Sequence, residues 1–262
     1  MAKPQAVPWV LLRGLTREAG HWGAFPACLA SALGIDEGML HAPDLPGNGL
    51  RWRENSPTRV EAIMAACRAE VRAQGVLPPY HLLALSLGGM VATAWALSYP
   101  DECQSLVLIN SSLKPDCSLL ERMRPQALRV LPGLLWSEAD RRESSILRLT
   151  SADPLRHAEI LSRWRELAAQ HPVSRWNALR QLLAAARFSA TEAPSVPTLI
   201  LASNGDRIAK ADCSARIADR WGAMFMRHPS AGHDLPLDAP DWVADQVRRW
   251  STINAKGACD SG

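Results

Sequence analysis

The sequence predicts an α/β fold in which about six mainly parallel strands carry helices on both faces. Short apolar runs alternate with segments of helical spacing over residues 9–110 and again over residues 198–250. Between these two parts, residues 112–189 show helical patterns and no convincing strand. A chain of 262 residues with 47% hydrophobic content can bury one large core, so we expect the middle stretch to be an insertion into that core.

The core elements follow from the apolar runs and from the Gly and Pro residues that separate them. Strands are expected at residues 9–12, 39–42, 81–85, 105–110, 198–202 and 223–227. Helices are expected at residues 21–33, 57–74, 88–99, 209–221 and 240–250.

The insertion is expected to contain four helices, at residues 119–131, 137–150, 154–170 and 174–188. Pro132, Pro154 and Pro172 separate them, because proline removes a hydrogen-bond donor and ends a helix. The expected organisation is a core of residues 1–111 and 190–251, a helical cap of residues 112–189 and a disordered tail of residues 252–262.

Composition excludes several classes of protein. The net charge is only +3 and no run of Lys and Arg exceeds two residues, so a nucleic-acid partner is not indicated. The first apolar run is broken by Arg13 and is too short for a signal peptide or a membrane span, so we expect a cytoplasmic protein without a membrane partner. The six scattered cysteines contain no CxxC pair, which favours reduced, mostly buried thiols and no metal site.

Residues 80–99, YHLLALSLGGMVATAWALSY, show a buried strand that ends at Ser86 and a small-residue helix that begins at once. A sharp bend between a strand and a helix pushes the residue at the bend outward. Packing the helix back against its own strand leaves no room for large side chains two positions on either side. Ala84 and Gly88 are therefore small for a steric reason.

This stretch resembles the nucleophile elbow of the α/β-hydrolase family, with Ala84 where the family usually has Gly. In organisation the chain resembles the lidded serine esterases that cleave pimeloyl-carrier methyl esters. The resemblance implies that Ser86 is a nucleophile, that a base and an acid follow in the order Ser, Asp, His, and that no cofactor or metal takes part.

The base and the acid are expected on loops at the carboxyl ends of strands, where the side chains of a parallel sheet converge. His233 follows the last expected strand in Ser-Ala-Gly-His-Asp, and Asp206 follows the strand before it in Asn-Gly-Asp. A structural loop histidine and a helix-capping aspartate are the plainer alternatives. Asp116 and Asp212 are the rival acids, the first inside the insertion and the second on a helix.

An oxyanion intermediate needs two preorganised donors. The resemblance assigns them to the backbone N–H groups of Leu87 and Leu15. Arg13 stands where the family has a histidine; it is a candidate for binding an anionic substrate, although pairing with a nearby carboxylate is the favoured interpretation. Residues 44–49, Asp-Leu-Pro-Gly-Asn-Gly, match a family turn that we interpret as scaffold.

The insertion concentrates basic charge. From Lys114 to Arg187 there are one Lys and twelve Arg against eight acidic residues, a local charge of +5 that leaves about −2 for the remainder. A solvated helical face is the plainer interpretation, and attraction of an anionic ester or of an acyl group on an acidic carrier protein is the sharper one. Trp136, Trp164 and Trp176 are candidates to line an acyl pocket, although tryptophans at helical spacing more often belong to a core.

Together these features predict a serine carboxylesterase that forms an acyl-enzyme and acts on a small-molecule ester. Thioester, lactone or C–C bond hydrolysis would use the same residues, and a ligand-binding protein with a vestigial triad is the alternative outside enzymes. A serine at the elbow argues against a dehalogenase, which needs a carboxylate there. The sequence leaves the acyl specificity and the oligomeric state open.

Overall fold

A single parallel sheet organises the computed structural model, which describes residues 7–155 and 158–260. Its six strands run in the order β2-β1-β3-β4-β5-β6, and every neighbouring pair is parallel. The predicted fold class is thereby confirmed. The strands are β1 (Trp9–Leu12), β2 (Leu40–His41), β3 (Tyr80–Leu85), β4 (Cys103–Ile109), β5 (Thr198–Ser203) and β6 (Met224–His228).

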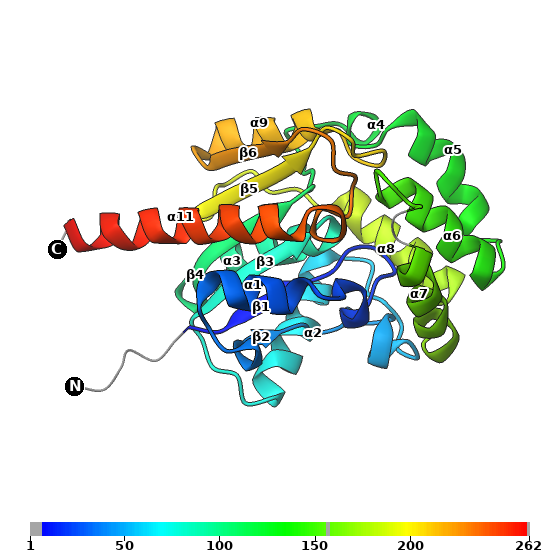
Figure 1. Cartoon of the computed structure of the whole chain (residues 1–262), viewed down its shortest axis with the longest axis horizontal. Coiled ribbons are helices and arrows are strands. Elements are labelled where there is room, and N and C mark those ends of the chain that lie inside the picture. The colour runs from blue at the N-terminus through cyan, green and yellow to red at the C-terminus, as the bar shows by residue number, and fades with distance from the viewer. Residues whose placement is uncertain (1–6, 156–157, 261–262) are drawn as a thin grey trace.

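Two hydrophobic layers cover the sheet, because side chains of a strand point alternately to its two faces. In β1, Val10 and Leu12 enter one layer, and Trp9 and Leu11 enter the other. Helices on both faces close these layers (Figure 1). The first layer is covered by α2 (Val60–Ala73), α3 (Leu87–Ser98) and α9 (Ala211–Trp221), and the second by α1 (Phe25–Leu33), α10 (Leu235–Asp238) and α11 (Pro240–Asp260).

Between β4 and β5, the described residues form five helices that gather at one end of the sheet, away from both chain termini (Figure 1). We call this part the cap. Its helices are α4 (Leu119–Arg122), α5 (Pro125–Leu134), α6 (Ala139–Thr150), α7 (Ala158–Gln170) and α8 (Arg175–Arg187). The cap begins and ends at a narrow neck, where the N–H of Ala190 donates to the carbonyl of Lys114 over 2.9 Å.

The helix boundaries of the cap correct one expectation. Pro132 was predicted to end a helix, but it lies inside α5, which continues to Leu134. A proline so near the end of a helix disturbs only its last turn, and the cost is small. An additional break lies between α4 and α5, where Met123 adopts an extended backbone conformation, so the helix expected at residues 119–131 is divided in two.

The expectation that all cysteines are reduced is also wrong. Cys117, at the start of the cap, is joined by a disulfide to Cys213 of α9, and the two Cα atoms lie 5.9 Å apart. The chain separation is 96 residues, so only the folded arrangement brings the two thiols together. Cys28, Cys67 and Cys103 are free.

Helix α11 is longer than expected. It runs to Asp260 and so includes most of the stretch that was expected to be a disordered tail. Apart from Gly257, residues 251–260 contain no strong helix breaker, and extending an existing helix is easier than starting one. Within the described ranges, no helix has both the length and the apolar character needed to cross a membrane.

Candidate active site

Ser86 occupies a strained bend between β3 and α3. Its backbone has φ 57° and ψ −119°, a conformation rarely adopted by residues other than glycine, and its N–H donates to the carbonyl of Ile109 over 2.9 Å. Tight packing around the bend requires Gly88. A Cβ there would lie 2.6 Å from the carbonyl oxygen of Arg13 and closer still to that of Leu12.

The loop after β1 passes directly beside this bend. A Cβ on Gly14 would lie 3.2 Å from the Cβ of Ser86 and 3.7 Å from its Oγ. The next residue, Leu15, and the first residue of α3, Leu87, both line the same cavity as Ser86. The two residues expected to supply oxyanion donors therefore flank the serine, and their role as donors stays a prediction.

His233 and Asp206 meet over the carboxyl ends of β5 and β6. The Nδ1 of His233 lies 2.7 Å from Oδ2 of Asp206, and both side chains are buried. The other carboxylate oxygen of Asp206 accepts from the N–H groups of Ile208 and Ala209, so the acid is fixed in one orientation. Because Nδ1 is engaged, Nε2 is the ring nitrogen left to act on Ser86 or on a substrate.

Electrostatics at this pair favour a basic imidazole. Burial lowers the pKa of His233, but the charge of Asp206 and the hydrogen bond to it outweigh burial, with a smaller contribution from Asp234. The pKa of His233 therefore stands above its ordinary value. An imidazole with a raised pKa accepts a proton more readily from a hydroxyl group.

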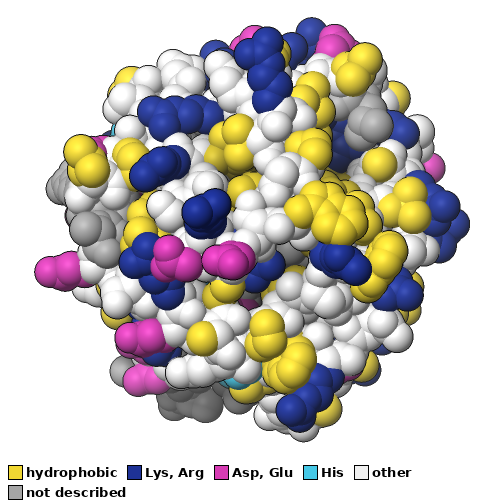
Figure 2. All heavy atoms as spheres, turned by 90° about the vertical axis from the view of Figure 1, so that its right-hand side faces the viewer, with side chains coloured by type: hydrophobic (Ala, Val, Ile, Leu, Met, Phe, Trp, Pro, Cys, Tyr) yellow, Lys and Arg dark blue, Asp and Glu magenta, His cyan; other side chains and the backbone are white. Residues whose placement is uncertain are grey.

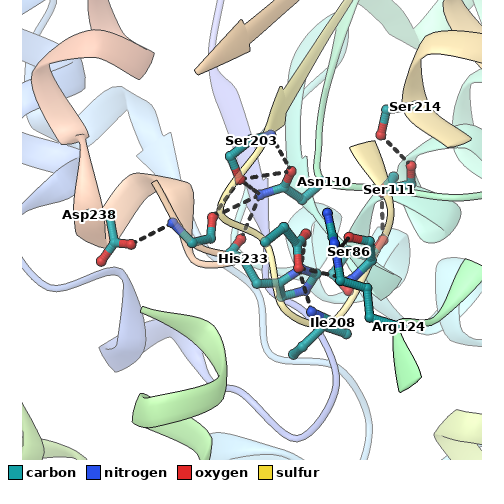
Figure 3. Close-up of polar contacts among 12 residues, drawn as sticks. Ser86, Asn110, Ser111, Arg124, Ser203, Ile208, Ser214, His233 and Asp238 are labelled. Atoms are coloured by element: carbon teal, nitrogen blue, oxygen red, sulfur yellow. Dashed lines mark hydrogen bonds and ion pairs between the residues drawn. The ribbon is translucent and has the colours of Figure 1, made fainter. Parts of the chain in front are cut away.

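Asn110 holds the loop that carries His233, and it also contacts Ser203 (Figure 3). Neither Asn110 nor Ser203 was predicted from the sequence as part of the site. The amide nitrogen of Asn110 donates to the carbonyl of His233 over 2.8 Å, and its amide oxygen accepts from the N–H of Ser203 over 3.0 Å. Asn110 has φ 45° and follows β4 directly. A polar residue at the end of a central strand was the only signal available in the sequence.

Residues of the cap and of α10 also fix this loop. The N–H of Asp234 donates to the carbonyl of Thr150 at the end of α6, and Asp238 accepts from the N–H of Gly232 over 2.7 Å. A Cβ on Gly232 would lie 2.7 Å from the backbone nitrogen of Ala152. The position of His233 thus depends on contacts from the core and from the cap.

The rival acids lie elsewhere. Asp116 pairs with Arg220 over 2.6 Å, and the exposed Asp212 pairs with Arg227 over 2.9 Å. Neither lines the cavity that contains Ser86. The sequence has six histidines besides His233, and one of them, His157, lies outside the described residues.

Arg13 has the structural role that the sequence favoured. It is buried, and its guanidinium binds both carboxylate oxygens of Asp234, at 3.1 and 2.5 Å. The same guanidinium lies 4.7 Å from the ring centroid of Trp22. These contacts fix the loop after β1 against the loop after His233, and they occupy the charge that was considered for an anionic substrate.

The cap closes a cavity of about 220 Å³ over Ser86 and His233. Of the three tryptophans considered, Trp164 is buried and lines this cavity, where the guanidinium of Arg17 stacks on it at 4.9 Å. Trp136 and Trp176 do not line it; they are 71% and 59% exposed. Apolar side chains from core and cap form most of the wall: Leu15, Leu87, Met90, Leu131, Leu134, Leu135, Ile146, Leu149, Leu182 and Ile208.

Residues 9–246 match the model of the alpha/beta hydrolase family, and the chain belongs to this family. Among curated proteins it is 39% identical, over 106 residues, to a pimeloyl-[acyl-carrier protein] methyl ester esterase of Aeromonas hydrophila subsp. hydrophila. That match spans 39% of this chain and only 37% of the relative.

Solved structures share the fold along nearly the whole chain. A thermophilic esterase from Thermogutta terrifontis superposes with a TM-score of 0.72 at 21% identity, covering 95% of this chain and 90% of the esterase. An enol-lactonase from Burkholderia xenovorans LB400 superposes with a TM-score of 0.75 at 17% identity, covering 95% and 92% of the two chains. At these identities the likeness establishes the fold only.

Proposed function

We propose that the protein is a serine hydrolase that cleaves a carboxylic ester through an acyl-enzyme. The observation that carries the proposal is the serine at a strained bend, in one cavity with a histidine whose Nδ1 lies 2.7 Å from a buried aspartate. A serine hydroxyl is a poor nucleophile at neutral pH, and an oriented imidazole is what activates it.

In this proposal the Oγ of Ser86 attacks the ester carbonyl carbon while its proton passes to Nε2 of His233. The N–H groups of Leu15 and Leu87 bind the oxyanion of the tetrahedral intermediate. Its collapse breaks the C–O bond, and His233 gives the proton to the departing alkoxide. Asp206 stabilises the imidazolium throughout.

The second half of the reaction repeats these steps with water. His233 takes a proton from a water molecule, the resulting hydroxide attacks the acyl carbon, and a second tetrahedral intermediate forms at the same donors. The ester bond to Ser86 breaks, the proton returns to Oγ, and the carboxylic acid leaves. Apart from the ester and this water molecule, both halves use only groups of the chain.

An ester is favoured over a lactone, a thioester or a C–C bond by the curated Aeromonas relative, which is a methyl ester esterase and is 39% identical over the stretch that matches. The lactonase among the structural neighbours keeps lactone hydrolysis as the second candidate. The acyl group enters a mostly apolar cavity of about 220 Å³, which favours a short to medium chain over a bulky one.

The test is a pre-steady-state measurement on p-nitrophenyl esters of increasing acyl length. The proposal predicts a burst of nitrophenol close to one equivalent per protein for any ester whose deacylation is slow, and Ser86→Ala should lower kcat by a factor on the order of 10³ or more. Ser112→Ala removes another hydroxyl that lines the cavity and should retain the burst. Undiminished hydrolysis by Ser86→Ala would contradict the proposal. Faster cleavage of lactones or thioesters than of the p-nitrophenyl esters would favour lactone or thioester hydrolysis instead.

A further inference from the structure

Arg122, the last residue of α4, is a cation in the cavity wall that has no carboxylate partner among the residues the structure describes. Its side chain is 4% exposed. Its three contacts are all with neutral acceptors: Nε donates to Oγ of Ser112 and Nη1 to the carbonyl of Ala185, both over 3.1 Å, while Nη2 lies 3.5 Å from the sulfur of Met90. A guanidinium has five N–H groups, so Nη1 and Nη2 each retain one hydrogen without an acceptor among the described residues.

Other buried arginines of the same wall have acidic partners. Arg13 is held by both oxygens of Asp234, and Arg17 lies 2.6 Å from Oε2 of Glu143. The pKa of Arg122 is lowered by burial, and burial is its only cause. In Arg220, by contrast, the hydrogen bond to Asp116 raises the pKa.

The position of Arg122 relates it directly to the proposed nucleophile. Met90 lies on α3 one turn after Ser86, about 6 Å along the helix axis. Arg122 contacts the side chain of Met90 and also that of Ser112, and both Ser86 and Arg122 line the cavity. From this rise and the contact with Met90, we estimate a span on the order of a few methylene groups between the serine and the guanidinium.

A buried cation among apolar side chains is costly unless an anion accompanies it. A carboxylate matches the planar fork of a guanidinium and brings one negative charge. A phosphate monoester would bring about −1.5 to −2 charges, which the single positive charge of Arg122 matches less well than it matches a carboxylate.

We infer that Arg122 binds a carboxylate of the substrate, and that the favoured substrates are half esters of short dicarboxylic acids. The inference rests on the proposed ester hydrolysis, because the half esters are substrates only if the protein cleaves them. The preference for binding an anionic ligand does not itself require catalysis. Arg122 orients the acyl chain by its free carboxylate while the ester carbonyl lies at Ser86.

The plainer role for Arg122 is structural, because its contacts join α4 to α8 and to the nucleophile helix. The two roles make different predictions. If the role of Arg122 is structural, replacing it changes the melting temperature or weakens the binding of every ligand equally. If Arg122 binds a carboxylate, replacing it changes the ratio of the affinities for an anionic and a neutral ligand of the same shape.

The experiment measures binding by calorimetry at pH 8 in the full chain carrying Ser86→Ala, so that esters are not consumed. Monomethyl glutarate, an anion, is compared with dimethyl glutarate, its neutral counterpart. The inference predicts that the monoester binds at least about 10-fold more tightly, the equivalent of one strong charge-assisted contact. Adding Arg122→Met should reduce this preference to within about 2-fold.

Arg124→Met is the matched control. Arg124 lies two residues along the chain, its Nε donates to the carbonyl of Ala209, and it does not line the cavity, so the preference should survive there. Arg122→Gln gives a second readout if Arg122→Met does not fold, because glutamine keeps a donor near Ser112 and lacks the charge.

Two results would overturn the inference: equal affinity for the monoester and the diester before Arg122 is changed, or a preference that persists in Arg122→Met. Failure of the proposed hydrolysis would be seen separately, as a wild-type protein that binds the monoester and does not cleave it.

Discussion

At the scale of the residue, the pairing of His233 with Asp206 sets when the site can work. In the proposed mechanism His233 must be neutral to take the proton of Ser86, so kcat/KM should fall as the pH drops through the pKa of the imidazole. That pKa is raised, because Asp206 outweighs the effect of burial. The acid limb of the pH profile should therefore have its midpoint above the ordinary value of about 6.5.

Asp206→Asn separates the effect of Asp206 on the pKa of His233 from the effects of burial and of Asp234. Without the charge of Asp206, burial dominates and the pKa of His233 falls, so the acid limb should move to lower pH. The tautomer of the imidazole is also lost, and kcat should fall on the order of 10³- to 10⁴-fold. Asp212→Asn alters the rival aspartate, which is exposed, and should leave both the limb and kcat unchanged. An acid limb that stays in place in Asp206→Asn would contradict the assignment.

Sequence reasoning brought Ser86, Asp206 and His233 together, because each follows a strand of a parallel sheet and such strands end at one edge. It could not find Arg122. In the sequence Arg122 stands next to Glu121, which suggests a paired surface residue, whereas in the structure Glu121 turns to Arg216 over 3.3 Å. That Arg122 lacks a carboxylate partner within the described part of the chain is a property of the folded arrangement.

At the scale of the element, the bend between β3 and α3 depends on the backbone after β1. Gly88 lies in the first turn of α3, against the carbonyl groups of Leu12 and Arg13. Gly14 in turn approaches Ser86. The strand, the helix and the loop that carries Leu15 therefore form one packed unit, and a change in any of them displaces the other two.

Gly88→Ala tests this unit. Alanine is favoured over glycine in a helix by about 1 kcal/mol, but its Cβ would overlap backbone atoms that cannot move aside. We expect the free energy of unfolding to fall by about 2 kcal/mol or more, with esterase activity at least about 10-fold lower, as measured by denaturation and initial rates. Gly133→Ala, a helical glycine of α5 with no atom near the new Cβ, should be neutral or stabilising. Equal stability of the two variants would contradict the packing argument.

Element boundaries show where sequence patterns stop being informative. Apolar runs located the six strands to within one or two residues. The four inner strands β1, β3, β4 and β5 are apolar because they are buried on both faces of the sheet. Pro132 did not end α5, and the link between Cys117 and Cys213 was missed. The effect of Pro132 depends on where the helix ends, and the disulfide depends on the packing of the cap against α9. Neither is a local property of the chain.

At the scale of the whole molecule, charge is distributed unevenly. Basic side chains are scattered among hydrophobic ones over the face that Figure 2 presents, with fewer acidic side chains between them. Several cap arginines are internally paired, such as Arg163 with Glu166, which supports the plainer interpretation of a solvated helical face. Arg129 and Arg141 are exposed and remain candidates for attracting an anionic substrate or an acidic carrier.

Reversing this surface charge tests the attraction. Arg129→Glu with Arg141→Glu should raise KM for an anionic ester by about 2- to 10-fold at low salt and leave a neutral ester unchanged, with the difference disappearing as ionic strength rises. Arg249→Glu on α11, which lies on the core, is the matched control and should change neither substrate. An equal rise in KM for the neutral ester would contradict the hypothesis that the cap attracts anions.

The central claim is that Ser86 is a nucleophile activated by His233, and covalent labelling tests it most directly. Wild-type protein treated with a fluorophosphonate probe should gain one adduct, which mass spectrometry of the digested chain should place on Ser86. Ser86→Ala should gain none, and Ser112→Ala should label like the wild type. An unlabelled wild-type protein, or an adduct that persists in Ser86→Ala, would contradict the account.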